Sequence, residues 1–217
     1  MNIDNLLHKY FKECSSLPII EVFDNGNIYD VYVDIVKTLK NSPDIELGVL
    51  QLLSYCFYEI LDNVLTHSGK KTGTVLMHYE PSLSSIKILV ADDGVGIRQS
   101  LSENEKYKEI SEAEAIRLCL KNRVTDGKGM GYGLYSTICL VKNIGVVMEI
   151  HSGQHILRTD GEKEEVLDAP QWKGTIIYFE LHTDREIDPN SILENHVDVE
   201  AEFNETFIDT SDLDNLW

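Results

Sequence analysis

Apolar side chains recur at helical spacing in two stretches near the start of the chain. Between residues 28 and 39 they return every three or four positions, which predicts an amphipathic helix. The polar residues 41–44 interrupt this pattern. A longer helix is predicted over residues 45–66, and Ser68 with Gly69 supplies its stop signal. We therefore expect two consecutive helices in the first third of the chain.

Six shorter runs have the composition of strands, because β-branched and aromatic residues are frequent in them and turn-forming residues separate them. They cover residues 18–23, 72–79, 85–92, 146–152, 155–159 and 174–182. All but the first follow the long helix. This order favours a layered α+β or mixed α/β domain over a doubly wound sheet.

Differences in composition along the chain predict its domain organisation. Residues 1–44 are expected to add a strand and a helix that pack on the core or make a dimer contact. Residues 45–183 are expected to form the core domain, with the polar residues 98–128 as a lid. Residues 184–217 carry eleven acids and one base, which predicts a loosely docked tail. An apolar patch that could form a dimer interface or cap the core consists of Ile3, Leu6, Leu7, Tyr10 and Phe11.

The charge balance and the cysteines narrow the classes of function. The formal net charge is −18 and no basic patch interrupts it, which argues against a nucleic acid as the main partner. The four cysteines stand far apart without a CxxC pair, so reduced thiols in a cytoplasmic protein are the expected state. No apolar run approaches the ~18 residues that would span a membrane. The first residues also lack the pattern of a secretory signal.

The long helix presents polar residues along one edge. Glu59, Asn63 and His67 recur at every fourth position, opposite an apolar stripe. An amide oxygen suits Mg²⁺, a neighbouring carboxylate can take a proton from water or a hydroxyl, and an imidazole can contact a phosphate. A polar edge is also what any amphipathic surface helix shows. Taken alone, this edge leaves both interpretations open.

Two segments that contain glycines add candidate chemistry. Residues 88–97 read ILVADDGVGI, so a buried strand delivers Asp92 and then turns at Gly94 and Gly96. Such DG pairs are common in ordinary turns, yet Asp92 could also accept a hydrogen bond from an exocyclic amine such as that of adenine. Residues 127–137 read GKGMGYGLYST, and glycines ahead of a helix expose amides that favour phosphates. This is not a P-loop, because GxxxxGK[ST] is absent.

The order and spacing of these segments form a specific combination. It resembles the N, G1, G2 and terminal GT motifs of the GHKL ATPase superfamily, which includes DNA gyrase B, histidine kinases and the anti-sigma-factor serine kinases. The matching residues are Glu59 with Asn63, Asp92 with Gly94 and Gly96, Gly129 with Gly131 and Gly133, and Gly174 with Thr175. The resemblance covers about residues 45 to 182.

The resemblance implies a fold and a ligand. The fold would be the Bergerat sandwich, an α+β, two-layer arrangement in which helices cover one face of a mixed, mostly antiparallel sheet. ATP with Mg²⁺ would lie between the helices and the lid. Asp92 would bind the adenine amine, with Thr175 nearby through water. Glu59 would be the general base or would orient the attacking water, and Asn63 would coordinate Mg²⁺, which Glu59 would reach through water.

The resemblance also places residues around the rest of the nucleotide. Gly94 and Gly96 would let the base and sugar approach the backbone. His67 and Lys128 would lie near the phosphates. The remaining expected contacts, among them the glycines whose amides would meet the phosphates, are Ile97, Gly129, Gly131, Gly133 and Leu134.

The motifs do not decide to which branch of the superfamily the chain is most similar in function, and three hypotheses stay open. The motif style is most similar to that of the anti-sigma-factor serine kinases, and residues 98–128 contain no phenylalanine, so the F-box of histidine kinases is missing. The first hypothesis is a protein kinase or ATP-gated regulator of a partner protein, and a homodimer is compatible with it. The second is a stand-alone ATP-hydrolysing conformational module that works with a separate subunit. The third is a nucleotide-binding regulator without turnover.

Overall fold

The computed structural model describes residues 2–42, 44–128, 134–135, 137–138, 146–160 and 162–184. Its helices and strands are, in chain order, α1 (Ile3–Tyr10), β1 (Ile19–Asp24), α2 (Ile28–Lys40), α3 (Leu47–His67), β2 (Thr72–Glu80), β3 (Ser85–Ala91), α4 (Ile97–Leu101), α5 (Glu112–Leu118), β4 (Val147–Thr159) and β5 (Glu164–His182). Two short 3-10 helices, Pro81–Leu83 and Glu105–Tyr107, lie between them. The two consecutive helices predicted early in the chain are confirmed as α2 and α3.

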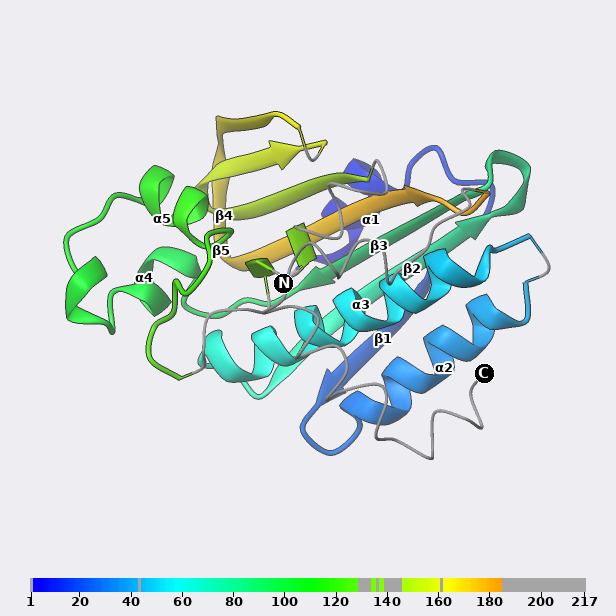
Figure 1. The fold of residues 1–217 in the computed structure, drawn as a ribbon, viewed down its shortest axis with the longest axis horizontal. Coiled ribbons are helices and arrows are strands. Elements are labelled where there is room, and N and C mark those ends of the chain that lie inside the picture. The colour runs from blue at the N-terminus through cyan, green and yellow to red at the C-terminus, as the bar shows by residue number, and fades with distance from the viewer. Residues whose placement is uncertain are drawn as a thin grey trace.

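The five described strands form one sheet in the order β1-β2-β3-β5-β4 (Figure 1). Strand β3 lies at its centre, where Ile88 pairs with Met77 of β2 and with Phe179 of β5. All four ladders are antiparallel. Because neither edge strand closes on the other, the sheet is open. The sheet with its helices confirms the predicted α+β class.

Helices α2 and α3 lie side by side on one face of the sheet (Figure 1). The apolar stripe of α3, with Phe57 and Ile60 almost fully buried, packs in the same cluster as Ile88 and Phe179 of the strands. Full burial of one such side chain contributes roughly 1.5–3 kcal/mol. This packing fixes the rotation of α3 about its own axis, and so it fixes where the polar edge of the helix points.

Helix α1 covers part of the opposite face of the sheet. Its residues Leu6 and Tyr10, together with Phe11, are buried against a second apolar cluster that includes Leu89 and Tyr178. The rings of Tyr10 and Tyr178 lie 4.7 Å apart. Of the two interpretations of this apolar patch, capping the core is the one that the structure shows. The resemblance implies helices on one face of the sheet only, and α1 adds a helix on the other face.

The last two strands are longer than the sequence predicts. The runs 146–152 and 155–159 are parts of one strand, β4, and β5 begins at Glu164 rather than at residue 174. Gly153 has a φ of +63°, and the register between β4 and β5 shifts on both sides of it. A glycine bulge therefore produces the break that the sequence suggests.

Residues 98–128, called the lid below after the role expected for them, are more ordered than their polar composition predicts. Helix α5 lies within this segment, and α4 and a 3-10 helix precede α5. Leu101, Tyr107 and Ala115 are buried in a small apolar cluster between these elements. The lid is therefore a packed unit with its own core.

Some predictions fall outside the described residues. They concern Gly129, Gly131, Gly133, most of the helix expected after this glycine stretch, and the acidic tail beyond Asp184. Within the described ranges, no helix has the length and apolar character needed to cross a membrane.

Candidate nucleotide-binding site

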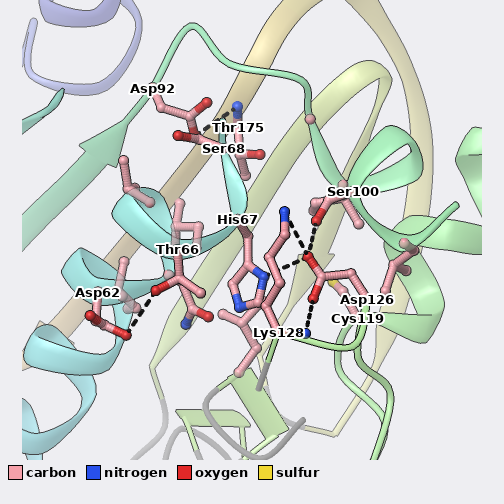
Figure 2. A pocket seen from close by; sticks show the side chains of 18 of the residues that line it. Asp62, Thr66, His67, Ser68, Asp92, Ser100, Cys119, Asp126, Lys128 and Thr175 are labelled. Carbon is pink, nitrogen blue, oxygen red and sulfur yellow. Dashed lines mark hydrogen bonds and ion pairs between the residues drawn. The ribbon is translucent and has the colours of Figure 1, made fainter. Parts of the chain in front are cut away.

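One edge of α3 forms a wall of a cavity of about 370 Å³. The other walls come from the end of β3, from β5 and from the lid (Figure 2). Glu59, Asn63 and His67 all line this cavity. The spacing of four residues therefore places the three polar side chains on one wall, as expected for one edge of a helix.

Asp92 lies at one end of the cavity, directly after β3 (Figure 2). Only 3% of the residue is exposed. One carboxylate oxygen accepts the Gly94 amide at 2.7 Å, and the other accepts the Thr175 amide at 3.2 Å. Burial raises the pKa of this carboxyl to about 6, although the hydrogen bonds from the two backbone amides oppose the rise. The amides hold the carboxylate in one orientation at the cavity.

The turn after Asp92 packs directly against the end of α3. A Cβ atom on Gly94 would collide with the carbonyl oxygen of Ser68, and the amide of Val95 donates to that same oxygen at 2.9 Å. Gly94 is not among the residues that line the cavity, whereas Gly96 is. The structure therefore gives Gly94 a packing role, and the approach of a base or sugar to it stays a prediction.

Asn63 presents an oxygen acceptor on the α3 wall. Its Nδ2 donates to the backbone carbonyl of Glu59 at 2.7 Å, which leaves Oδ1 as the acceptor of this half-buried amide. Mg²⁺ prefers such hard oxygens and keeps several waters, so it does not need a dense cluster of protein ligands. Among the described residues, no group of three or more His, Cys, Asp or Glu side chains is placed to hold a metal. The residues present fit a hydrated Mg²⁺.

A buried carboxylate that the sequence did not single out lies at the lid side of the cavity. Oδ2 of Asp126 accepts a hydrogen bond from Ser100 Oγ at 2.7 Å and lies 2.8 Å from Nδ1 of His67. The amide of Lys128 donates to Oδ1 at 3.0 Å. Burial favours a higher pKa for Asp126, but the three bonds outweigh it and lower the pKa. Figure 2 shows these partners converging on Asp126.

Lys128 also lines the cavity, next to Asp126. Its Nζ lies 3.0 Å from a carboxylate oxygen of Glu103 and 3.7 Å from Oδ2 of Asp126. The hydrogen bond to Glu103 raises the pKa of this ammonium group. Lys128 is therefore a fully charged cation at neutral pH.

Most of the predicted site residues come together around this one cavity. Those that line it are Glu59, Asn63, His67, Asp92, Gly96, Ile97, Lys128, Leu134 and Thr175. The three expected phosphate-binding glycines lie outside the described residues. The sequence did not indicate Ser100 or Asp126 as site residues. The one local signal is that Asp126 is an acid just ahead of a glycine-rich stretch.

The comparison with known families gives a direct assignment. A family model described as "Histidine kinase-, DNA gyrase B-, and HSP90-like ATPase" matches residues 48–185. The chain belongs to this ATPase family. The matched range contains α3, the central strands, the lid and β5, which together enclose the cavity. No curated protein matches the chain.

Membership in this GHKL-type family makes ATP the ligand of the domain. In this ATPase the two ends of the cavity differ. The buried Asp92, held by two backbone amides, lies at one end, and His67 of α3 lies at the other with Asp126 and Lys128 of the lid (Figure 2). Such an arrangement offers different chemistry to the two ends of a nucleotide.

Proposed function

We propose that this ATPase domain binds Mg-ATP between α3 and the lid and acts as a protein kinase or an ATP-gated regulator of a partner protein. The observation that carries the proposal is the shared wall of Glu59 and Asn63, which faces the same cavity as Asp92. The cavity volume, about 370 Å³, lies in the usual range of about 300–1,000 Å³ for ligand pockets.

The adenine ring lies at the Asp92 end in this proposal. The fixed carboxylate of Asp92 accepts a hydrogen bond from the exocyclic amine. Thr175 lies beside it, because its backbone amide donates a hydrogen bond to Asp92. The phosphates then point toward the lid, where His67 and Lys128 line the cavity. The negative charge of Asp92 would repel phosphates, which supports this orientation over the reverse one.

Asn63 Oδ1, with Glu59 through water, is the proposed Mg²⁺ site. Bound there, the ion neutralises part of the phosphate charge. The residues of the chain do the remaining work by positioning the acceptor and moving its proton.

In the kinase reaction, the hydroxyl oxygen of a partner side chain forms a bond to the γ-phosphorus. The bond from that phosphorus to the β–γ bridging oxygen breaks, and ADP leaves. Glu59 accepts the proton that the hydroxyl loses. With water in place of the hydroxyl, the same residues hydrolyse ATP.

The packed lid supports a second candidate, an ATP-hydrolysing conformational module that works with a separate subunit. The lid has a small core of its own, around Leu101, Tyr107 and Ala115. A segment with its own core can move as one body when a ligand binds. The described cysteines, Cys14, Cys56 and Cys119, are free, which supports a reducing compartment such as the cytoplasm for either candidate.

The fate of the γ-phosphate separates the two candidates. Purified full-length protein is incubated with γ-labelled Mg-ATP, with Glu59→Ala and Asn63→Ala as matched variants. The kinase or regulator proposal predicts tight ATP binding with little inorganic phosphate released until a partner protein is added. Both variants should then lose label transfer to the partner.

Steady release of labelled phosphate by the protein alone, lost in both variants, would favour the conformational module. Release that continues unchanged in Glu59→Ala would contradict the proposed role of that carboxylate in either candidate.

A further inference from the structure

Positive charge is scarce around the nucleotide cavity. Among the described residues, His67 and Lys128 are the lining side chains that can carry it. The lining carboxylates are Glu59, Asp62, Asp92 and Asp126. A triphosphate brings several negative charges, so in this cavity it depends on these two side chains, on backbone amides and on Mg²⁺. The placement of His67 and Lys128 therefore determines how well the cavity receives the phosphates.

Both of these side chains contact Asp126. The carboxylate lies 2.8 Å from Nδ1 of His67 and 3.7 Å from Nζ of Lys128, and it also accepts the Lys128 amide. Its side chain is only 1% exposed. Ser100 of α4 donates to it from a third direction at 2.7 Å, which prevents it from turning away. One buried carboxylate thus joins the end of α3 to both ends of the lid, α4 and the segment around Lys128.

We propose that Asp126 is a positioning residue that assembles His67 and Lys128 into a clasp for the terminal phosphates of the nucleotide. The inference rests on the ATP orientation proposed above. Because Nδ1 of His67 is held by Asp126, Nε2 is the ring nitrogen that remains for a ligand. Asp126 acts through its two partners and touches no phosphate, since like charges repel.

Lys128 can change partners when a phosphate arrives. Its closer carboxylate, Glu103, has a side chain that is 47% exposed, and exposed ion pairs of this kind are weak. Its backbone amide, in contrast, stays bonded to the buried Asp126. The main chain of Lys128 is therefore fixed while its ammonium group is free to exchange Glu103 for a phosphate oxygen.

The variant Asp126→Asn tests the clasp, because it keeps the shape of the side chain and removes its charge. The affinities of the full-length protein for AMP, ADP and ATP, each with Mg²⁺, are measured by titration calorimetry. We expect the loss to grow with the number of phosphates, from less than about twofold for AMP to about tenfold for ATP, the size of one charge-assisted hydrogen bond.

A combined variant shows whether Asp126 acts through its partners. In a His67→Gln, Lys128→Gln background, Asp126→Asn should cause little further loss of ATP affinity, because the groups it positions are already gone. The matched control is Asp160→Asn: this aspartate carboxylate is likewise hydrogen-bonded, accepting two backbone amides at 3.0 and 2.8 Å, but it lies outside the cavity. The control should leave all three affinities unchanged.

Ser100→Ala keeps the test decisive if Asp126→Asn fails to fold. It removes one bond to the carboxylate and should give the same dependence on phosphate number with a smaller loss. Equal losses for AMP, ADP and ATP, or a full additive loss in the combined background, would overturn the clasp. A wild-type protein that binds none of the three nucleotides would instead refute the nucleotide site itself, and neither result depends on a partner protein.

Discussion

Burial and hydrogen bonding compete at the Asp92 carboxyl. The side chain is taken out of water at the end of β3, which raises its pKa to about 6, while the amides of Gly94 and Thr175 favour the ionised form. The group therefore changes its charge in a mildly acidic range, above the usual range of an aspartate. A ligand that donates a hydrogen bond to Asp92 favours the ionised form.

Adenosine affinity should fall as the pH is lowered through about 6. In the free protein the Asp92 carboxyl takes up a proton near that pH, and this protonation competes with binding of the adenine amine. Adenosine is the probe because it has no phosphate that titrates in the same range. Calorimetry between about pH 5 and pH 8 measures the effect. Asp92→Asn should bind weakly throughout and lack the step, and a wild-type affinity that is constant with pH would contradict this role.

Gly94→Ala should destabilise the fold by about 2 kcal/mol or more, measured by urea unfolding. The added methyl group would collide with the backbone oxygen of Ser68, which has little room to move. Gly26→Ala is the matched control, because its nearest neighbour is the flexible carboxylate of Asp24 at 3.2 Å. Similar losses in the two variants would show that the close approach at Gly94 is not what matters.

Local spacing makes some site residues predictable and others not. Glu59, Asn63 and His67 share one helix, so a period of four places them on one wall of the cavity. Asp126 is 59 residues from His67 in the chain, and their contact exists only after the lid has packed. No pattern near Asp126 marks that partner, which is why this carboxylate was missed.

At the scale of elements, apolar periodicity predicts the helices and strands that bury one face against the core. Helix α3 and the central strands β2 and β3 have regular apolar patterns, and their positions were predicted to within a few residues. The first half of β5 has no such pattern, because most of its side chains are exposed. Pro170 also reads as a strand breaker, yet it lies where the register with β4 shifts, a place where proline is tolerated.

Helix α1 offers a test at this scale, because one of its leucines is buried and a leucine beyond its end is exposed. Leu6→Ala should lower the free energy of unfolding by about 2–4 kcal/mol, since the leucine is 2% exposed against the sheet. Leu17→Ala, at a site 83% exposed, should change it by less than about 0.5 kcal/mol. Thermal and urea unfolding measure both.

Nucleotide affinity should be unchanged in Leu6→Ala at temperatures where the protein is folded, because α1 covers the face of the sheet opposite α3 (Figure 1). If Leu6→Ala were as stable as the wild type, α1 would not be part of the folded core.

For the whole molecule, the order of the motifs along the chain was enough to predict the family and its sheet-and-helix architecture. The sequence left two roles open for the apolar patch of α1, and it did not predict the small core of the lid, because both depend on contacts between segments far apart in sequence. These additions leave the cavity as the meeting point of α3, β3, β5 and the lid. The central claim for the molecule is that this cavity recognises adenine through a hydrogen bond to Asp92 and holds the phosphates under the lid.

The most direct test compares the binding of Mg-ATP and Mg-GTP to the full-length protein by titration calorimetry. Adenine presents an amine donor where guanine presents a carbonyl acceptor, and a mismatch of this kind costs about 1–3 kcal/mol. We predict that ATP binds at least about tenfold more tightly than GTP and that Asp92→Asn removes most of this preference. Equal affinities for ATP and GTP in the wild type would contradict adenine recognition by Asp92, and binding of neither nucleotide would contradict the site as a whole.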